Sequence, residues 1–531
     1  MIAAALALLT LLTALPAVVG SPASGGIPVL QKSGSTTRLM VDGQPLVMLA
    51  GELQNSSSSS LAYMEPIWPR LAGLNLNTVI ASISWELVEP QEGKFDFKLV
   101  DGLIQGAREH QTKLVFIWFG TWKNGDAAYV PAWVKTNWTR FPRCHHRPGI
   151  NTTQLTAFSE ENVKADAKAF AAVMRHIKEI DGRKHTVVMM QVENEAGVMP
   201  TSRDHCPLAE AAFAQPVPPE LMKYLLDHKE ELIPDLKEVW ARTSFRETGT
   251  WSEVFGEGPL ADEVFQAWHI ARYIGRVAAA GKAEYPLPMY ANAWLVQNKG
   301  QEPGKYPSGG PVAKMMDVWR AAAPSIDLLA PDIYLDDFKS VCAEYTQNGN
   351  PLFIPEASRD DRAGLRAYYA IGHHHALGFA PFGIDSLAET NVLREHYAVL
   401  KQLLPLLGTN HGTARLQGFW QYQDEKRVEF EIGDFRADIE YRSEEGGKPG
   451  AGIVIALAPD TFVMAGVNYA IRFPSRRDKP GNTAWLSIEE GDFQQGKWFP
   501  GRRLNGDEAW YRVNLGPKPR ILVGKVYRFP N

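Results

Sequence analysis

A repeated alternation of short apolar runs with amphipathic stretches constrains the fold of this 531-residue chain more than any other feature. Eight strand-like runs can be identified, and most of them precede a helix-like stretch. The runs cover residues 45–53, 78–84, 113–120, 186–195, 288–294, 326–334, 351–358 and 378–386. This alternation indicates a parallel sheet, and eight units favour a closed (β/α)8 barrel over an open sheet. The sequence therefore predicts an α/β barrel (a TIM barrel) over residues 21–410, with a helical insertion at about 219–283.

A second region with a different pattern follows the predicted barrel. After about Gly412, short β-like runs alternate with turns rich in Gly, Pro and Asp. These runs cover residues 419–442, 450–471, 485–488, 510–514 and 521–529. Short strands at this spacing indicate an antiparallel β-sandwich. We therefore expect a C-terminal β-sandwich domain over residues 411–531 that supports the barrel.

The composition narrows the class of protein. Apolar residues make up 45% of the chain and charged residues 22%, which excludes a disordered chain, a collagen or a coiled coil. The chain has 55 Lys and Arg against 60 Asp and Glu, so we expect no nucleic-acid partner. The 15 Trp residues are a mild surplus, and flat indole faces suit sugar rings as well as protein cores. A large enzyme or binding protein is expected.

The N-terminus has the pattern of a secretory signal. Residues 2–15 are apolar except for two Thr, Pro16 ends the run, and the first charged side chain is Lys32. A membrane anchor is the alternative, but a span needs about 20 apolar residues and this run is shorter. We therefore predict a signal peptide over residues 1–20 and a secreted, extracellular protein that is free of the membrane after cleavage.

Three acceptor sequences for N-linked glycan agree with secretion. They begin at Asn55, Asn137 and Asn151. Each triplet alone is weak evidence for a glycan, because such triplets arise by chance. Three of them in a secreted chain favour a glycoprotein.

The three cysteines allow two interpretations. Cys144 and Cys206 lie in loop-like stretches, and Cys342 lies in a helical-looking segment. In an oxidising compartment Cys144 and Cys206 can pair, which leaves Cys342 as a buried thiol. The alternative is a zinc cluster that combines Cys144 and Cys206 with the neighbouring histidines, but the spacing fits no standard zinc motif. We predict the disulfide, no metal site and no cofactor.

Two carboxylates at strand ends are the main candidates for chemistry. Glu195 closes the fourth predicted strand, and Glu356 closes the seventh. Catalytic side chains of (β/α)8 barrels come from the carboxyl ends of strands. Glycoside hydrolysis needs one carboxyl group that donates a proton to the leaving oxygen and one carboxylate that attacks the anomeric carbon. The alternative is that each Glu only pairs with an Arg at the rim.

The segments around these residues resemble known enzymes. Asn194-Glu195 and Glu356 resemble the "4/7" superfamily of retaining (β/α)8 glycosidases. Residues 191–197 and 130–133 resemble the family 35 β-galactosidases, and residues 85–97 resemble a segment shared by families 35 and 42. The likeness covers roughly residues 45–400 and indicates a divergent branch.

The resemblance implies roles for four residues. Glu195 is the implied acid/base and Glu356 the implied nucleophile. Asn194 is expected to hydrogen-bond the 2-hydroxyl of the sugar, and Tyr334 to donate a hydrogen bond to Glu356. Further strand-end groups are candidates for substrate binding at the barrel mouth, although a packing role is an equal alternative for each. These are Glu52, Trp118, Asn292, Trp294 and Asp385.

Strand geometry adds one expectation about the fourth strand. Glu193 and Glu195 are two residues apart, so a regular strand points both to one face and Asn194 to the other. For Asn194 and Glu195 both to reach a sugar, the strand must break its pleat at this end. Glu193 is then expected to have a structural role.

Together these observations and the resemblance predict a secreted retaining exo-β-glycosidase. Its expected substrates are β-linked oligo- or polysaccharides with terminal β-D-galactosyl residues. A β-glucoside or β-mannoside specificity is the first alternative, and a non-catalytic sugar-binding protein is the second. The sequence lacks a Gly-x-Ser-x-Gly elbow, a phosphate-binding glycine loop and a His-Glu-x-x-His motif, which disfavours other enzyme classes.

Overall fold

The described part of the chain comprises residues 26–34, 36–388, 390–442, 447–477 and 481–530 of a computed structural model. The predicted signal peptide, residues 1–20, lies outside the described residues. None of the helices in the described ranges has the length and apolarity that a membrane crossing requires.

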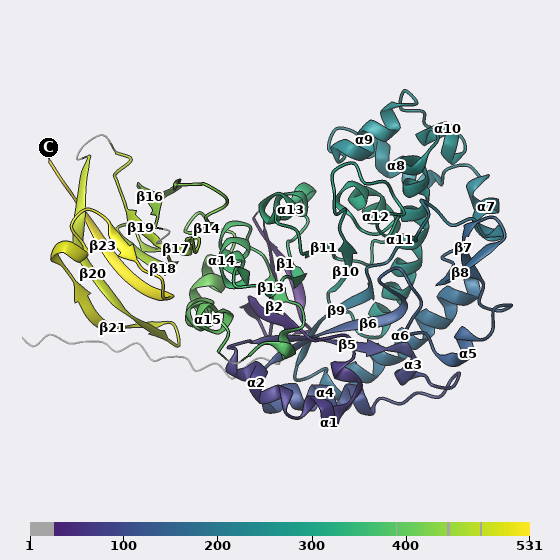
Figure 1. Cartoon of the computed structure of the whole chain (residues 1–531), viewed down its shortest axis with the longest axis horizontal. Coiled ribbons are helices and arrows are strands. Elements are labelled where there is room, and N and C mark those ends of the chain that lie inside the picture. The colour runs from purple at the N-terminus through teal and green to yellow at the C-terminus, as the bar shows by residue number, and fades with distance from the viewer. Residues whose placement is uncertain (1–25, 35, 389, 443–446, 478–480, 531) are drawn as a thin grey trace, which may run out of the picture.

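Eight parallel strands form a closed barrel, which confirms the predicted fold class (Figure 1). They are β4 (Met48–Glu52), β5 (Thr78–Ser84), β6 (Lys113–Lys123), β9 (Val187–Asn194), β10 (Met289–Trp294), β11 (Leu328–Ile333), β12 (Ile354–Ala357) and β13 (Gly378–Pro381). Neighbours pair in chain order, and β13 closes the barrel against β4. Apolar side chains fill the interior, among them Met48, Ile80, Ile117 and Met189. The barrel is therefore a packed core with its polar groups at one end.

Helices surround the barrel. Those outside the insertion are α1 (Leu61–Met64), α2 (Ile67–Gly73), α3 (Trp85–Val88), α4 (Lys98–Glu109), α5 (Ala132–Lys135), α6 (Glu160–Asp181), α12 (Met316–Ala322), α13 (Phe338–Glu344), α14 (Ala363–His373) and α15 (Leu393–Asn410). The sequence marks where α6 begins: the Ser159 hydroxyl accepts a hydrogen bond from the Asn162 N–H, and two Glu residues occupy the first turn. Both features stabilise a helix N-terminus.

The segment between β9 and β10 contains a group of helices beside the barrel (Figure 1). They are α7 (Pro207–Phe213), α8 (Pro219–Asp227), α9 (Pro234–Ala241), α10 (Trp251–Phe255) and α11 (Pro259–Glu284). Helix α11 packs along α6, and the two approach closely at Gly281, where a Cβ atom would lie 2.3 Å from the Phe170 ring. A larger residue there would push the helices apart.

A small N-terminal sheet, which the sequence analysis did not predict, covers the amino end of the barrel. It consists of β1 (Val29–Ser33), β2 (Thr36–Val41) and β3 (Gln44–Leu46). Leu39 and Val41 of β2 belong to the same buried cluster as the barrel interior. A second hairpin, β7 (Arg143–Arg147) and β8 (Ile150–Leu155), lies in the segment between β6 and α6.

Two antiparallel sheets follow α15. One contains β14 (Leu416–Trp420), β17 (Ala451–Ala458), β18 (Thr461–Val467), β20 (Asn482–Gln494), β21 (Lys497–Leu504) and β23 (Arg520–Phe529). The other contains β15 (Arg427–Ile432), β16 (Phe435–Tyr441), β19 (Tyr469–Arg472) and β22 (Val513–Leu515). A separate apolar core includes side chains from both sheets. The first sheet also packs on α14, where a Cβ at Gly372 would lie 2.6 Å from the Gly418 Cα, so the close contact requires glycine.

Candidate active site

The carboxyl end of β9 departs from regular strand geometry. Glu193 and Glu195 have φ angles of +64° and +46°. Non-glycine residues seldom adopt these angles, and such residues concentrate at functional sites. The Glu193 carboxylate accepts a hydrogen bond from the Trp122 N–H at 2.6 Å and lies against Asp166 of α6. The expected break in the pleat is therefore confirmed, and Glu193 has structural contacts.

Glu195 is buried at the barrel mouth and is held through its backbone. Its N–H donates to the Asn292 Oδ1 at 3.0 Å, and the Asn292 amide donates to the Asp332 Oδ2 at 2.6 Å. Burial, together with the negative charge of Glu356, raises the pKa of Glu195 to about 7, although Lys123 opposes the rise. Glu195 can therefore hold a proton near neutral pH.

Glu356 lies on β12 beside Asp332 of β11, because these two residues are partners in the parallel pairing. The Tyr334 hydroxyl donates a hydrogen bond to the Glu356 Oε1. Burial raises the pKa of Glu356, whereas the Lys123 ammonium and the Tyr334 hydrogen bond lower it. The Oε2 atom is buried and has no hydrogen-bond partner among the described residues. One oxygen of Glu356 is thus fixed by Tyr334, and the other is free to react.

Lys123 and Asp332 belong to this cluster but were missed by the sequence analysis. Lys123 lowers the pKa of Glu52, Glu195 and Glu356. The third strand was expected to end at residue 120, but β6 continues to Lys123, with an irregular register against β9. Asp332 carries the one signal that could have been used, a carboxylate within an otherwise apolar strand.

Three other predicted residues also lie at the mouth. Glu52 is the last residue of β4. Its side chain is buried, and one carboxylate oxygen has no partner among the described residues. Burial and Glu356 raise its pKa. Neither side-chain polar atom of buried Asn194 has a partner in the described part of the chain. Half-buried Trp294 ends β10, next to Asp332 in the pairing. Burying a polar atom without a hydrogen-bond partner costs free energy. The unpaired atoms of Glu52 and Asn194 therefore indicate a place for a polar ligand.

The structure does not bring Trp118 to the mouth. Its indole N–H donates to Asp166 at 2.8 Å, and its ring packs against Phe170 of α6. Its neighbours Ile117 and Phe119 point into the barrel, so alternation along β6 turns Trp118 outward. Trp118 therefore has the packing role that was its alternative, and the expectation that it lies at the mouth is wrong.

Asp385 likewise has a structural role and does not bind substrate. Its carboxylate accepts from the Gln54 N–H at 3.0 Å and from the Ser57 hydroxyl at 2.6 Å. Ser58 in turn donates to the Ser82 carbonyl at 2.7 Å. The run Ser56–Ser60 therefore fastens the loop after β4, and both carboxylate oxygens of Asp385 are committed to that loop.

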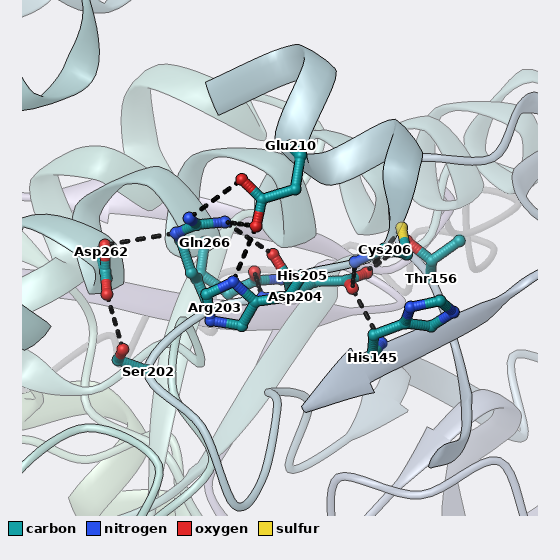
Figure 2. A network of polar contacts seen from close by, with 10 residues as sticks. All are labelled: His145, Thr156, Ser202, Arg203, Asp204, His205, Cys206, Glu210, Asp262 and Gln266. Carbon is teal, nitrogen blue, oxygen red and sulfur yellow. Dashed lines mark hydrogen bonds and ion pairs between the residues drawn. The ribbon is translucent and has the colours of Figure 1, made fainter. Parts of the chain in front are cut away.

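Cys144 and Cys206 are free, buried thiols in the structure, which corrects the predicted disulfide. Figure 2 shows the Asp204 carboxylate beside His145 and Cys206. Its Oδ1 accepts from the backbone N–H groups of His145 and Cys206, and its Oδ2 lies 3.4 Å from the Cys206 Sγ. Burial and the nearby Asp204 carboxylate raise the pKa of both thiols. The alternative zinc site is not assembled either, because no group of three or more metal-ligand side chains was found in the described ranges.

We expect peptide mapping without reductant to recover both cysteines as free thiols. Burial and Asp204 raise the pKa of Cys206 to about 11, so the native thiol should react slowly with iodoacetamide at pH 8 and rapidly after denaturation. A cross-linked peptide that contains Cys144 and Cys206 would contradict this arrangement.

Comparisons with known proteins concern mainly the barrel. Residues 67–265 match the family model for the family 42 glycoside hydrolases, which is described as "Beta-galactosidase". Residues 393–516, which include α15 and most of the C-terminal sheets, match a domain of unknown function, DUF5597. A β-galactosidase of Xanthomonas manihotis is 28% identical over 206 residues, which are 38% of this chain and 31% of that protein. The chain thus matches about a third of the length of this relative.

Solved structures with a related arrangement include two β-galactosidases. That of Bacillus circulans sp. alkalophilus has 16% identity and a TM-score of 0.46, and the match covers 68% of this chain and 57% of that one. That of the haloarchaeon Halorubrum lacusprofundi has 16% identity and a TM-score of 0.46, with 67% and 58% covered. Residues 67–265 of the barrel are therefore similar to the family 42 β-galactosidases.

Proposed function

We propose that this protein is a secreted retaining exo-β-glycosidase that hydrolyses terminal β-D-galactosyl residues. One observation carries the proposal. Glu195 directly follows β9 and Glu356 lies near the end of β12, yet the two interact electrostatically within one buried cluster. Glu195 has a pKa near 7, and Glu356 is hydrogen-bonded by Tyr334. Motif residues 191–197 further support a relationship to family 35 alongside family 42.

The first step of the proposed reaction forms a covalent intermediate. A Glu356 oxygen bonds to the anomeric carbon while the glycosidic C–O bond breaks, and the proton of Glu195 moves to the leaving oxygen. In the second step the Glu195 carboxylate takes a proton from water, and the water oxygen displaces Glu356 from the anomeric carbon. Sugar and free enzyme are regenerated, and no cofactor takes part in either step.

The unpaired groups at the mouth supply contacts to the sugar. Asn194 can hydrogen-bond the 2-hydroxyl, and the Glu52 carboxyl group can bond to a pair of hydroxyls. Trp294 offers an indole face for the apolar side of the ring. Asn292 accepts from the backbone N–H of Glu195, and Asp332 accepts from the Asn292 amide, so both are positioning residues.

The stereochemistry of the first product tests this mechanism. We expect ¹H NMR at early times to show the β-anomer of galactose, because two inversions at one carbon retain configuration. A panel of aryl β-galactoside, β-glucoside and β-mannoside tests the sugar, with the galactoside expected to have the highest kcat/KM. If the α-anomer forms first, the enzyme inverts and the roles of Glu195 and Glu356 are wrong.

Secretion and glycosylation form a separate proposal, supported by the apolar N-terminal segment and by surface positions. Asn137 and Asn151 are exposed, whereas Asn55 is half-buried and its side-chain oxygen is enclosed. We expect the secreted protein to begin near Ser21 and to carry glycan on at least one of these residues, with Asn137 and Asn151 more fully occupied than Asn55. Intact mass before and after deglycosylation measures this. An unmodified protein that retains Met1 would contradict the proposal.

A further inference from the structure

The C-terminal sheets contain a pocket that the proposed chemistry does not use. Its volume is about 500 Å³, and it lies where the first half of β20, the end of β21 and the short helix η5 (Gly506–Glu508) meet. Figure 1 shows β20 near the end of the molecule opposite the barrel. We name it the Trp510 pocket after one of its lining residues. Ligand pockets for small molecules have volumes of about 300–1,000 Å³, so one or two sugar rings fit here.

Two indoles line the pocket in different ways. Trp510 is 85% exposed, the highest value among the exposed large apolar side chains. Trp485 is half-buried, and its ring stands perpendicular to that of Phe473 at 5.7 Å. A Cβ at residue 524 would lie 2.6 Å from the Trp485 ring, so Gly524 leaves room for it. Trp485 is thus fixed by packing, whereas Trp510 presents a free indole face to solvent.

Polar groups without partners stand next to the indoles. Among the described residues, neither the Asp507 carboxylate nor the Ser487 hydroxyl has a hydrogen-bond or ion-pair partner. The Arg503 guanidinium donates to the Leu486 carbonyl at 3.1 Å, which leaves its remaining N–H groups free to donate. The pocket therefore combines free acceptors, free donors and an aromatic face.

This combination suits a neutral sugar better than other ligands. A pyranose has an apolar C–H face that stacks on indole, and hydroxyl pairs that bond to carboxylate and guanidinium groups. The charges of Arg503 and Asp507 cancel, so a phosphate or a uronic acid gains little net attraction. A protein partner is disfavoured, because such interfaces need a larger, flatter apolar surface.

We propose that the Trp510 pocket binds a neutral pyranosyl unit of the polysaccharide from which the barrel removes galactosyl residues. The identity of that polysaccharide rests on the proposed function, whereas binding of a neutral sugar does not. The pocket lies outside the barrel, so it would hold the polymer near the enzyme without touching the reacting bond.

Affinity electrophoresis of the full-length chain tests the proposal. Native gels contain β-1,4-galactan, arabinogalactan or hydroxyethylcellulose, and the Glu356→Gln background prevents hydrolysis during the run. We expect at least one polysaccharide to retard the chain and Trp510→Ala to weaken that affinity at least tenfold. The matched control is Phe499→Ala, because Phe499 is 48% exposed on β21 but does not line the pocket. It should stay within twofold of its parent.

Two results would overturn the proposal: retardation by none of the three polysaccharides, or equal retardation of Trp510→Ala and its parent. Thermal melting checks that Trp510→Ala folds, and Asp507→Ala replaces it if it does not. With Glu356 restored, Trp510→Ala should hydrolyse an aryl β-galactoside within twofold of wild type. Absence of that hydrolysis in wild type would contradict the proposed function, while the gel result would still decide the sugar-binding pocket.

Discussion

Replacing Glu356 with Ala is expected to abolish turnover of all β-galactosides. The variant lacks the oxygen that forms the covalent bond, and the alanine leaves a hole below the anomeric carbon. We expect kcat to fall by about 10⁴-fold or more, which corresponds to ~5.5 kcal/mol of transition-state stabilisation. Steady-state kinetics with aryl β-galactosides measure the loss. If instead Glu356→Gln retains turnover, the nucleophile assignment is wrong.

Azide distinguishes loss of the nucleophile from loss of the fold. In Glu356→Ala, azide can enter the vacated space and attack the anomeric carbon once, so the expected product is α-galactosyl azide. Asp385→Asn is the matched control, because Asp385 is also a buried carboxylate at the mouth but its oxygens are committed to the loop after β4. It should lower the melting temperature and keep most of the turnover. A sugar-binding protein without activity would show unchanged ligand affinity in Glu356→Gln and no product with any variant.

Replacing Glu195 with Ala is expected to have a selective effect. Alkyl galactosides need the proton that Glu195 donates, so their kcat/KM should fall by about 10²–10⁴-fold, the usual contribution of general acid catalysis. For aryl galactosides with good leaving groups, the rate of the first step should fall much less. Azide should here give β-galactosyl azide, since Glu356 remains. Equal losses for both substrate classes would contradict the acid role.

The pH dependence follows from the pKa of Glu195, about 7. Glu195 must be protonated to donate, so hydrolysis of alkyl galactosides should be supported below this pKa and be lost as pH rises through about 7. In Glu195→Gln, the residual kcat/KM for activated aryl galactosides should not fall as pH rises through about 7. Measurement of kcat/KM from pH 4 to 9 tests both statements.

The sequence was sufficient to predict the barrel and to place two carboxylates at the carboxyl ends of its fourth and seventh strands. Parallel strands buried on both faces read as apolar runs, and a carboxylate at the end of such a run is costly unless it has a function. Glu195 and Glu356 both met that description, and the structure brings them into one cluster with Tyr334 and Asn292. Even the broken pleat at Glu193 could be predicted, because strand alternation made a regular strand incompatible with the motif.

Only the tertiary structure decided which other strand-end groups belong to the site. Lys123 belongs to the site because β6 continues three residues further than predicted and its register against β9 shifts. Asp385 does not belong to it, because a loop more than 300 residues earlier in the chain occupies its oxygens. Cys144 and Cys206 are free thiols, and Asp204 binds the Cys206 thiol and backbone. The sequence determines which residues can form strands and where charge is costly, since these depend on neighbours along the chain. Which side chains meet depends on register, bulges and returning loops, and these are determined only when the whole barrel packs.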